Sequence, residues 1–168
     1  AKVPDYLDRE GVTQPEFERW LRKELPETLP EMTRLATRFG VPMILGVEQY
    51  HYDRTGQRRF NCAALVTADG KMTQPVYAKM HPVMFGEYIP LADRFPWLQR
   101  ITPLAASLSA GDRPVAFDLD GLRLAPSICD ESVLPHRIGR QMRSLAAERR
   151  EPDILVNLTN DGWFWGSS

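Results

Sequence analysis

The first residue with recognisable chemistry is Cys129, which ends an apolar run and precedes a short acidic segment that leads to Pro135. A strand, a sharp turn and a helix in this order are typical of a nucleophile elbow, which exposes one side chain near a helix N-terminus. A thiol in that position is favoured as the thiolate and attacks acyl carbonyls. The alternative is that Cys129 is a small buried hydrophobe, as free cysteines often are.

Two charged side chains of segment 77–90 could act together with such a thiol. Lys79 lies between apolar residues, and an ammonium partly withdrawn from water can stabilise an oxyanion or a thiolate, although most lysines reach solvent. Glu87 follows Phe-Gly and precedes Tyr-Ile-Pro, a constrained setting that would hold a carboxylate in place. Otherwise Glu87 is a hydrogen-bond acceptor that stabilises the loop.

Metal and cofactor chemistry is not expected from this sequence. The three histidines are scattered and adjoin no acidic residue at a metal-ligand spacing, so we predict no metal site and no cofactor. The two cysteines have neither zinc-ribbon nor thioredoxin spacing, so both are predicted to be free thiols.

The composition is that of a soluble globular protein. The 168 residues are 43% hydrophobic and 26% charged, and 21 basic residues balance 22 acidic ones. Such a balance provides no field that would attract nucleic acid, which is excluded as a partner. The longest apolar run is far shorter than the roughly 20 residues of a membrane-spanning helix, so membrane contact is expected only through segments outside this chain.

Periodicity predicts α/β layers that position these residues. Segment 15–39 has helical spacing with a break near Pro26 and Pro30, and Gly40 ends the second helix. The other expected elements are strand 41–47, a polar loop at 50–57, strand 61–67, an irregular loop at 77–90, two strands around an Asp-Gly turn in 117–128, helix 136–150 and strand 153–158. Cys129 thus ends a strand.

Three segments resemble the apolipoprotein N-acyltransferase branch of the nitrilase superfamily. They are Tyr-Ala-Lys-Met-His-Pro-Val-Met-Phe-Gly-Glu-Tyr-Ile-Pro-Leu at 77–91, Ser-Ile-Cys-Asp-Glu at 127–131 and Asn-Leu-Thr-Asn-Asp-Gly-Trp-Phe at 157–164. Their order and spacing both fit, and the first and last are specific to that branch. A lysine and a later strand-end cysteine alone would fit any nitrilase relative.

The resemblance implies an αββα sandwich with a Glu-Lys-Cys active site and covalent catalysis through a thioester. Cys129 would be the nucleophile, Lys79 the stabiliser of oxyanion and thiolate, and Glu87 an additional active-site glutamate. Glu131 matches the glutamate of the family's Cys-Tyr-Glu pattern, and Trp163 belongs to the closing segment that would support the site.

The resemblance also implies the substrates and the location. The acyl donor would be a phospholipid, and the acceptor would be the N-terminal amine of a diacylglyceryl-cysteine lipoprotein. The protein would lie in the bacterial inner membrane with its catalytic domain facing the periplasm.

The chain departs from the family pattern at two points. Asp130 stands where the family usually has an aromatic residue, and it adds negative charge beside the thiol. The family's general-base glutamate should end a strand before the first helix, but Glu10, Glu16 and Glu18 follow no apolar strand, so none is assigned that role. We therefore expect residues 1–168 to be a partial nitrilase-like domain, incomplete at both ends, and inactive or prone to aggregation when isolated.

Two other functions are compatible with the same residues. A soluble carbon–nitrogen hydrolase, such as an amidase or carbamoylase, would release its thioester with water. A catalytically silent nitrilase fold would bind lipid or a protein partner. Apolar, lipid-facing loops around the site would favour the acyltransferase over the soluble hydrolase.

Overall fold

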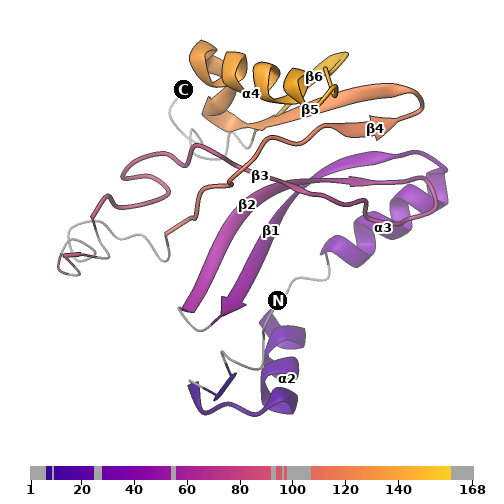
Figure 1. Ribbon diagram of the computed structural model, residues 1–168. Coiled ribbons are helices and arrows are strands. Elements are labelled where there is room, and N and C mark those ends of the chain that lie inside the picture. The colour runs from indigo at the N-terminus through magenta and orange to yellow at the C-terminus, as the bar shows by residue number, and fades with distance from the viewer. Residues whose placement is uncertain are drawn as a thin grey trace, which may run out of the picture.

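The computed structural model of the protein describes residues 7–8, 10–24, 28–53, 56–91, 94–95, 97 and 107–159. Two sheets lie one above the other, with helices on their outer sides (Figure 1). In chain order the elements are α2 (Gln14–Glu24), α3 (Thr28–Phe39), β1 (Met43–Asp53), β2 (Gly56–Val66), β3 (Tyr77–Ala78), β4 (Phe117–Leu119), β5 (Leu122–Ile128), the 3-10 helix η2 (Cys129–Val133), α4 (Pro135–Ala147) and β6 (Ile154–Leu158).

The first sheet has the order β1-β2-β3, and all of its pairs are antiparallel. The polar stretch 50–57 was predicted to be a loop, but β1 and β2 continue into it as one long hairpin. Cross-strand contacts explain the difference. The ring of His51 packs edge-on against Phe60 at 5.2 Å, and Arg58 pairs with Asp53 at 3.0 Å. Such pairs stabilise a strand even where its sequence is polar.

The second sheet has the order β4-β5-β6 and carries the candidate nucleophile at the end of its central strand. β4 and β5 are antiparallel and are joined by Asp120 and Gly121, whose φ angles of 50° and 82° suit a tight two-residue hairpin turn. β5 and β6 are parallel, and α4 provides the long connection that parallel strands need.

The sheets pack face to face, and the core lies between them. Leu145 of α4 packs against Ala116 and Ala125 on the outer side of the second sheet. Helix α3 lies beside the first sheet, on the side away from the second (Figure 1). The layers therefore follow the predicted order of helix, sheet, sheet and helix. The buried residues between the sheets are Ala63, Leu65, Tyr77, Val115, Phe117, Leu124 and Ile128.

The predicted helical region 15–39 forms two helices, α2 and α3. Pro30 is not a break, because it lies in the first turn of α3, where the backbone N–H has no intrahelical partner. Gly40, with φ of 64°, ends α3 as predicted. No helix in the described ranges is long and apolar enough to cross a membrane.

Candidate active site

Cys129 is the first residue after β5, where the chain turns sharply into η2. Its φ of 56° lies in the left-handed region, which is strained for a residue other than glycine. Strain of this kind concentrates at functional sites. The partly exposed side chain is presented at the strand end, and α4 begins at Pro135. The local geometry is thus the predicted elbow.

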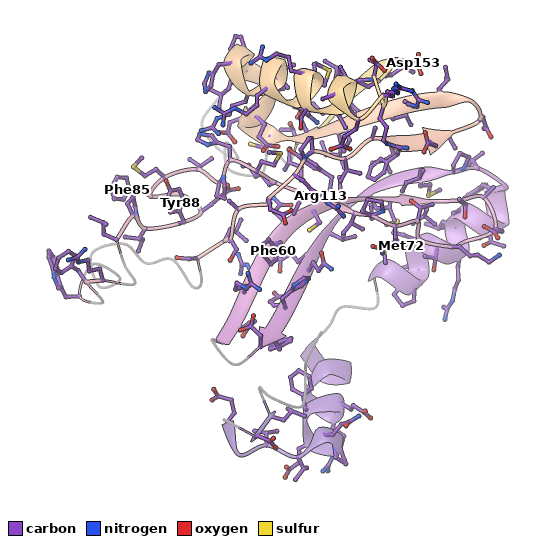
Figure 2. The ribbon with its side chains drawn as sticks, viewed as in Figure 1. Phe60, Met72, Phe85, Tyr88, Arg113 and Asp153 are labelled. Atoms are coloured by element: carbon purple, nitrogen blue, oxygen red, sulfur yellow. The ribbon has the colours of Figure 1, made fainter. Side chains whose placement is uncertain are left out.

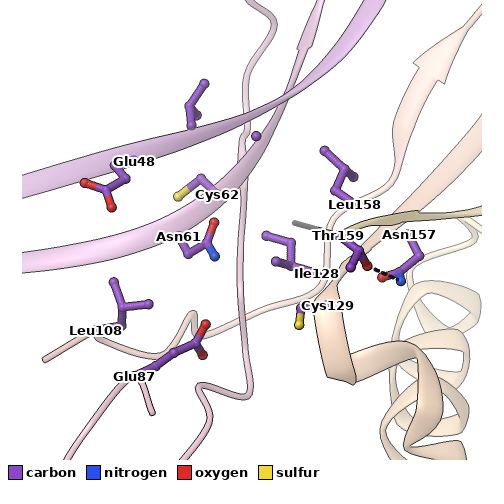
Figure 3. A pocket seen from close by; sticks show the side chains of 12 residues that line it. Glu48, Asn61, Cys62, Glu87, Leu108, Ile128, Cys129, Asn157, Leu158 and Thr159 are labelled. Atoms are coloured by element: carbon purple, nitrogen blue, oxygen red, sulfur yellow. Dashed lines mark hydrogen bonds between the residues drawn. The ribbon is translucent and has the colours of Figure 1, made fainter. Parts of the chain in front are cut away.

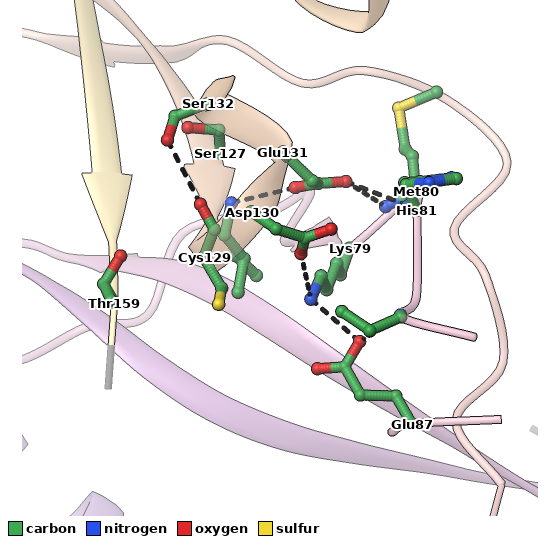
Figure 4. A network of polar contacts seen from close by, with 12 residues as sticks. Lys79, Met80, His81, Glu87, Ser127, Cys129, Asp130, Glu131, Ser132 and Thr159 are labelled. Atoms are coloured by element: carbon green, nitrogen blue, oxygen red, sulfur yellow. Dashed lines mark hydrogen bonds and ion pairs between the residues drawn. The ribbon is translucent and has the colours of Figure 1, made fainter. Parts of the chain in front are cut away.

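Glu131 joins the elbow to the segment that contains the lysine. Glu131 is only 4% exposed, and its carboxylate accepts four hydrogen bonds of 2.8–2.9 Å. One donor is the hydroxyl of Tyr77. The others are the backbone N–H groups of Met80, His81 and Ile128; Figure 4 shows Glu131 bonded to the first two. Burial, together with the charge of Glu131, raises the pKa of Tyr77, so its hydroxyl stays a donor. Glu131 therefore fixes two distant segments against each other.

Lys79 directly follows β3, and its side chain is 1% exposed. Its Nζ lies 2.8 Å from Oε2 of Glu87 and 2.9 Å from Oδ1 of Asp130 (Figure 4). Burial opposes the ammonium charge, but the hydrogen bonds to Glu87 and Asp130 outweigh it and raise the pKa of Lys79. A buried ammonium thus forms an ion pair with Asp130, the residue that follows Cys129.

Glu87 is held by the backbone of its own loop. Its Oε2 accepts a hydrogen bond of 2.7 Å from the N–H of Val83 and a second one from Nζ of Lys79. The loop closes on itself, because the N–H of Glu87 donates to the carbonyl of Val83 at 2.7 Å. The constrained loop that was predicted from the sequence therefore aims this carboxylate at Lys79.

A cavity of about 640 Å³ opens between the two sheets, with Cys129 in its wall. Glu87 lines it from the loop at 79–90, called the lysine loop because it contains Lys79. Glu48 and Asn61 line it from the first sheet (Figure 3). Its size suits an organic ligand rather than a single ion. The lining residues are Gly46, Val47, Glu48, Asn61, Cys62, Glu87, Leu108, Ile128, Cys129, Asn157, Leu158 and Thr159.

The two cysteines have different environments. Cys62 belongs to β2, is 0% exposed, and its Sγ donates a 3.7 Å hydrogen bond to Oε1 of Gln49. Burial raises the pKa of Cys62 to about 11, so at neutral pH it is a protonated and unreactive thiol. Cys129 is the partly exposed thiol of the two, and the residue that directly follows it, Asp130, pairs with the ammonium of Lys79.

The early glutamates lie far from this cavity. Glu16 accepts hydrogen bonds of 3.0 Å and 2.6 Å from the N–H and hydroxyl of Thr13, which caps α2, and these lower its pKa. Glu18 accepts a hydrogen bond from Gln14 within the same helix. Helix α2 packs through Phe17 at the opposite end of the hairpin (Figure 1).

Trp163 lies outside the described residues.

Sequence reasoning missed the pairing of Asp130 with Lys79 and the two residues that line the cavity from the first sheet. Glu48 and Asn61 face each other in the β1–β2 register. Asn61 alternates with the buried Ala63 and Leu65, so it lies on the inward face. The sequence did not reveal this, because residues 62–66 are all apolar and buried and so do not distinguish the two faces of the strand.

The model of the carbon–nitrogen hydrolase family matches residues 7–168. The apolipoprotein N-acyltransferase of Rhodopirellula baltica is 39% identical over 170 residues, which cover 100% of this chain and 27% of the relative. That of Haemophilus ducreyi is 28% identical over 156 residues, which cover 88% of this chain and 28% of the relative. The chain thus spans little more than a quarter of these relatives.

Solved structures of the nitrilase superfamily share the fold. A cysteine-to-serine mutant of the Nesterenkonia AN1 amidase, from the nitrilase superfamily, has a TM-score of 0.51 and 16% identity, covering 81% of this chain and 44% of that one. A mutant of the amidase from Nesterenkonia sp. AN1, with acrylamide added at its active-site cysteine, has a TM-score of 0.52 and 15% identity, covering 88% and 51%. The predicted nitrilase-like α/β fold is confirmed.

Proposed function

The chain belongs to the carbon–nitrogen hydrolase family, and from that premise we propose that it forms part of an enzyme that transfers a fatty acyl group through a thioester on Cys129. The donor is a phospholipid ester, and the acceptor is the N-terminal amine of a diacylglyceryl-cysteine lipoprotein. The enzyme lies in the bacterial inner membrane, with this domain on the periplasmic side. The names of the curated relatives support the acyl transfer.

The observation that carries the proposal is the buried ammonium of Lys79, which pairs with Glu87 and with Asp130, the residue directly after Cys129. Lys79 has three N–H donors. Glu87 accepts a hydrogen bond from one of them at 2.8 Å, and Asp130 forms an ion pair with the same Nζ at 2.9 Å. Within the described ranges Glu87 is the one side chain that accepts a hydrogen bond from Nζ, so N–H donors remain for the oxyanion that forms when a thiolate attacks a carbonyl. Held at both carboxylates, the ammonium needs no reorganisation during the reaction.

The chemistry balances in two steps. The sulfur of Cys129 bonds to the acyl carbon, the ester C–O bond breaks, and the lysophospholipid alcohol leaves with the thiol proton. The acceptor amine then bonds to the same carbon, the C–S bond breaks, and the thiol regains a proton as the amide forms. Glu87 orients Lys79 in both steps.

Exposed apolar side chains near the site favour a lipid donor over a small amide. Five of them belong to the described residues of segment 84–97 (84–91, 94–95 and 97), and Phe85 and Tyr88 of this segment lie on a loop that extends away from both sheets (Figure 2). A soluble protein rarely exposes such a group without a partner, and a fatty acyl chain or bilayer surface would cover it. The residues and their exposures are Met84 (54%), Phe85 (59%), Leu91 (64%), Phe95 (43%) and Trp97 (57%).

A small-amide hydrolase is the second candidate. The amidases that share the fold favour it, since the same thioester could be released by water instead of an amine. The two candidates differ in the acyl donor, a phospholipid ester or a small amide, and in the group that attacks the thioester, an amine or water.

Mass spectrometry of the full-length protein after incubation with phospholipid tests the proposal. We expect an acyl adduct on the peptide that contains Cys129, removed by hydroxylamine and absent from Cys129→Ser. Cys62→Ala is the matched control and should keep the adduct, because the Cys62 thiol is buried and protonated. Addition of a lipopeptide amine should then discharge the adduct into an amide.

Three results would contradict lipid acyl transfer. Discharge by water at the same rate with or without the amine indicates a hydrolase. A missing adduct on a Cys129 that iodoacetamide still alkylates indicates a small-amide substrate. A Cys129 that neither acylates nor alkylates indicates a silent fold.

A further inference from the structure

Asp130 is a second carboxylate partner of Lys79, in addition to Glu87. The two carboxylates lie 2.9 Å and 2.8 Å from the same Nζ. The side chain of Lys79 is 1% exposed, that of Glu87 is 12% exposed, and that of Asp130 is 32% exposed. Asp130 is therefore the more accessible partner of a buried charge, and it is bonded in sequence to Cys129.

In the part of the chain that the structure describes, the ionisable groups on the elements around Cys129 come from four segments, and half of them are carboxylates. Glu131 carries a charge that four hydrogen-bond donors already stabilise. Among residues 154–159, the described part of the β6 side, those that line the cavity are uncharged: Asn157, Leu158 and Thr159. The ionisable groups are Lys79, His81 and Glu87 of the lysine loop, Tyr77 of β3, Asp130 and Glu131 of η2, and Glu48 and Cys62 of the hairpin.

The charges around Lys79 therefore do not balance, and the negative ones are in excess. One ammonium faces the carboxylates of Glu87 and Asp130, so the group of three carries a net charge of −1 when all are ionised. With Glu87 alone, the pair would be neutral. A nearby negative charge disfavours the thiolate form of a thiol, and Asp130 directly follows Cys129 in the chain.

We propose that Asp130 is a positioning residue that shares Lys79 with Glu87 and sets the pH at which Cys129 becomes reactive. As a second anion, 2.9 Å from Nζ, it holds the ammonium in place. As a second negative charge it keeps the thiol less ionised than it would be beside an uncharged residue. This inference rests on Cys129 as the nucleophile of the proposed function, but it does not depend on the acyl donor or acceptor.

The test is the pH profile of iodoacetamide alkylation at Cys129 in the full-length protein, followed on the Cys129 peptide by mass spectrometry. Asp130→Asn keeps an acceptor oxygen for Lys79 and removes the charge. Its alkylation midpoint should fall by about one pH unit, with alkylation about tenfold faster below the midpoint. Asp130→Glu should keep the wild-type midpoint. Asp120→Asn, the same change in the exposed β4–β5 turn, should leave it unchanged.

An unchanged or higher midpoint in Asp130→Asn overturns the inference, and so does an equal fall in Asp130→Glu. If Asp130→Asn does not fold, Asp130→Ser repeats the removal of charge. Failure of both to fold while Asp130→Glu folds would make the carboxylate a requirement of folding, which also overturns the inference. The predicted shift without any acyl adduct would sustain this role and remove the proposed acyl transfer.

Discussion

The carboxylate of Glu131 is matched to its surroundings by charge as well as by shape. All four of its partners are donors, and they come from two segments about 50 residues apart in sequence. A glutamine would place its own N–H₂ against one or two of those donors and leave them unpaired in a buried place, at a cost of about 1–3 kcal/mol each. The residue is thus explained by hydrogen bonding that holds Lys79 and Cys129 in register, without any contact with substrate.

Cys62 predicts a loss of stability at alkaline pH. Its pKa rises from 9.0 to about 11 on folding, so the unfolded thiol ionises first, and between these values ionisation stabilises the unfolded state relative to the folded one. The contribution is complete below pH 9 and is lost as the pH rises to about 11, about 2–3 kcal/mol in all. Calorimetric unfolding of the full-length protein at pH 8 and pH 10.5 should show a smaller decrease of Tm in Cys62→Ala than in the wild type. Equal decreases would refute the assignment; Tyr77, whose pKa is also raised, accounts for the remainder.

At the scale of elements, the lysine loop depends on a close approach by the chain around Gly111. The N–H of Gly111 donates to the carbonyl of Lys79 at 2.8 Å, and a Cβ added to Gly111 would lie 2.3 Å from the carbonyl oxygen of Ala78. Gly111→Ala must therefore displace the backbone that carries Lys79. We expect a loss of about 1–3 kcal/mol in unfolding free energy together with slower acylation of Cys129.

Gly46→Ala is the control for that change in stability. A Cβ at Gly46 meets no atom within 4 Å, so its unfolding free energy should stay within about 0.5 kcal/mol of the wild type. Denaturant unfolding of the full-length protein measures both variants. A Gly111→Ala protein as stable and as active as the wild type would show that the loop tolerates the shift.

The elements around Cys129 could be predicted because their signals are local. An apolar run before Cys129 and a proline shortly after it define a strand, a turn and a helix within about ten residues. The pair of Asp130 and Lys79 could not be predicted, because it depends on how β3 and β5 come together between two sheets. The extension of the hairpin was missed for a similar reason, since cross-strand pairs such as His51 with Phe60 stabilise it.

At the scale of the whole molecule, the exposed apolar segment and the β4–β5 turn point to opposite sides (Figure 1). If segment 84–97 meets the lipid donor, Phe85→Ser should slow acylation by long-chain phospholipid in vesicles. Burial of one phenylalanine in an apolar phase is worth about 1.5–3 kcal/mol, so the apparent KM for the vesicle donor should rise about tenfold or more. Acylation by a water-soluble short-chain ester should not change, because it needs only the cavity.

Leu122→Ser provides the matched control, since Leu122 is 47% exposed and begins β5 at the opposite turn. It should change neither rate, because the same loss of apolar surface occurs away from the lipid. Equal slowing of both substrates in Phe85→Ser would indicate damage to the loop that carries Glu87, and equal slowing of the vesicle donor in both variants would indicate a general loss of solubility or stability. Only a defect confined to Phe85→Ser and to the vesicle donor assigns this segment to the lipid.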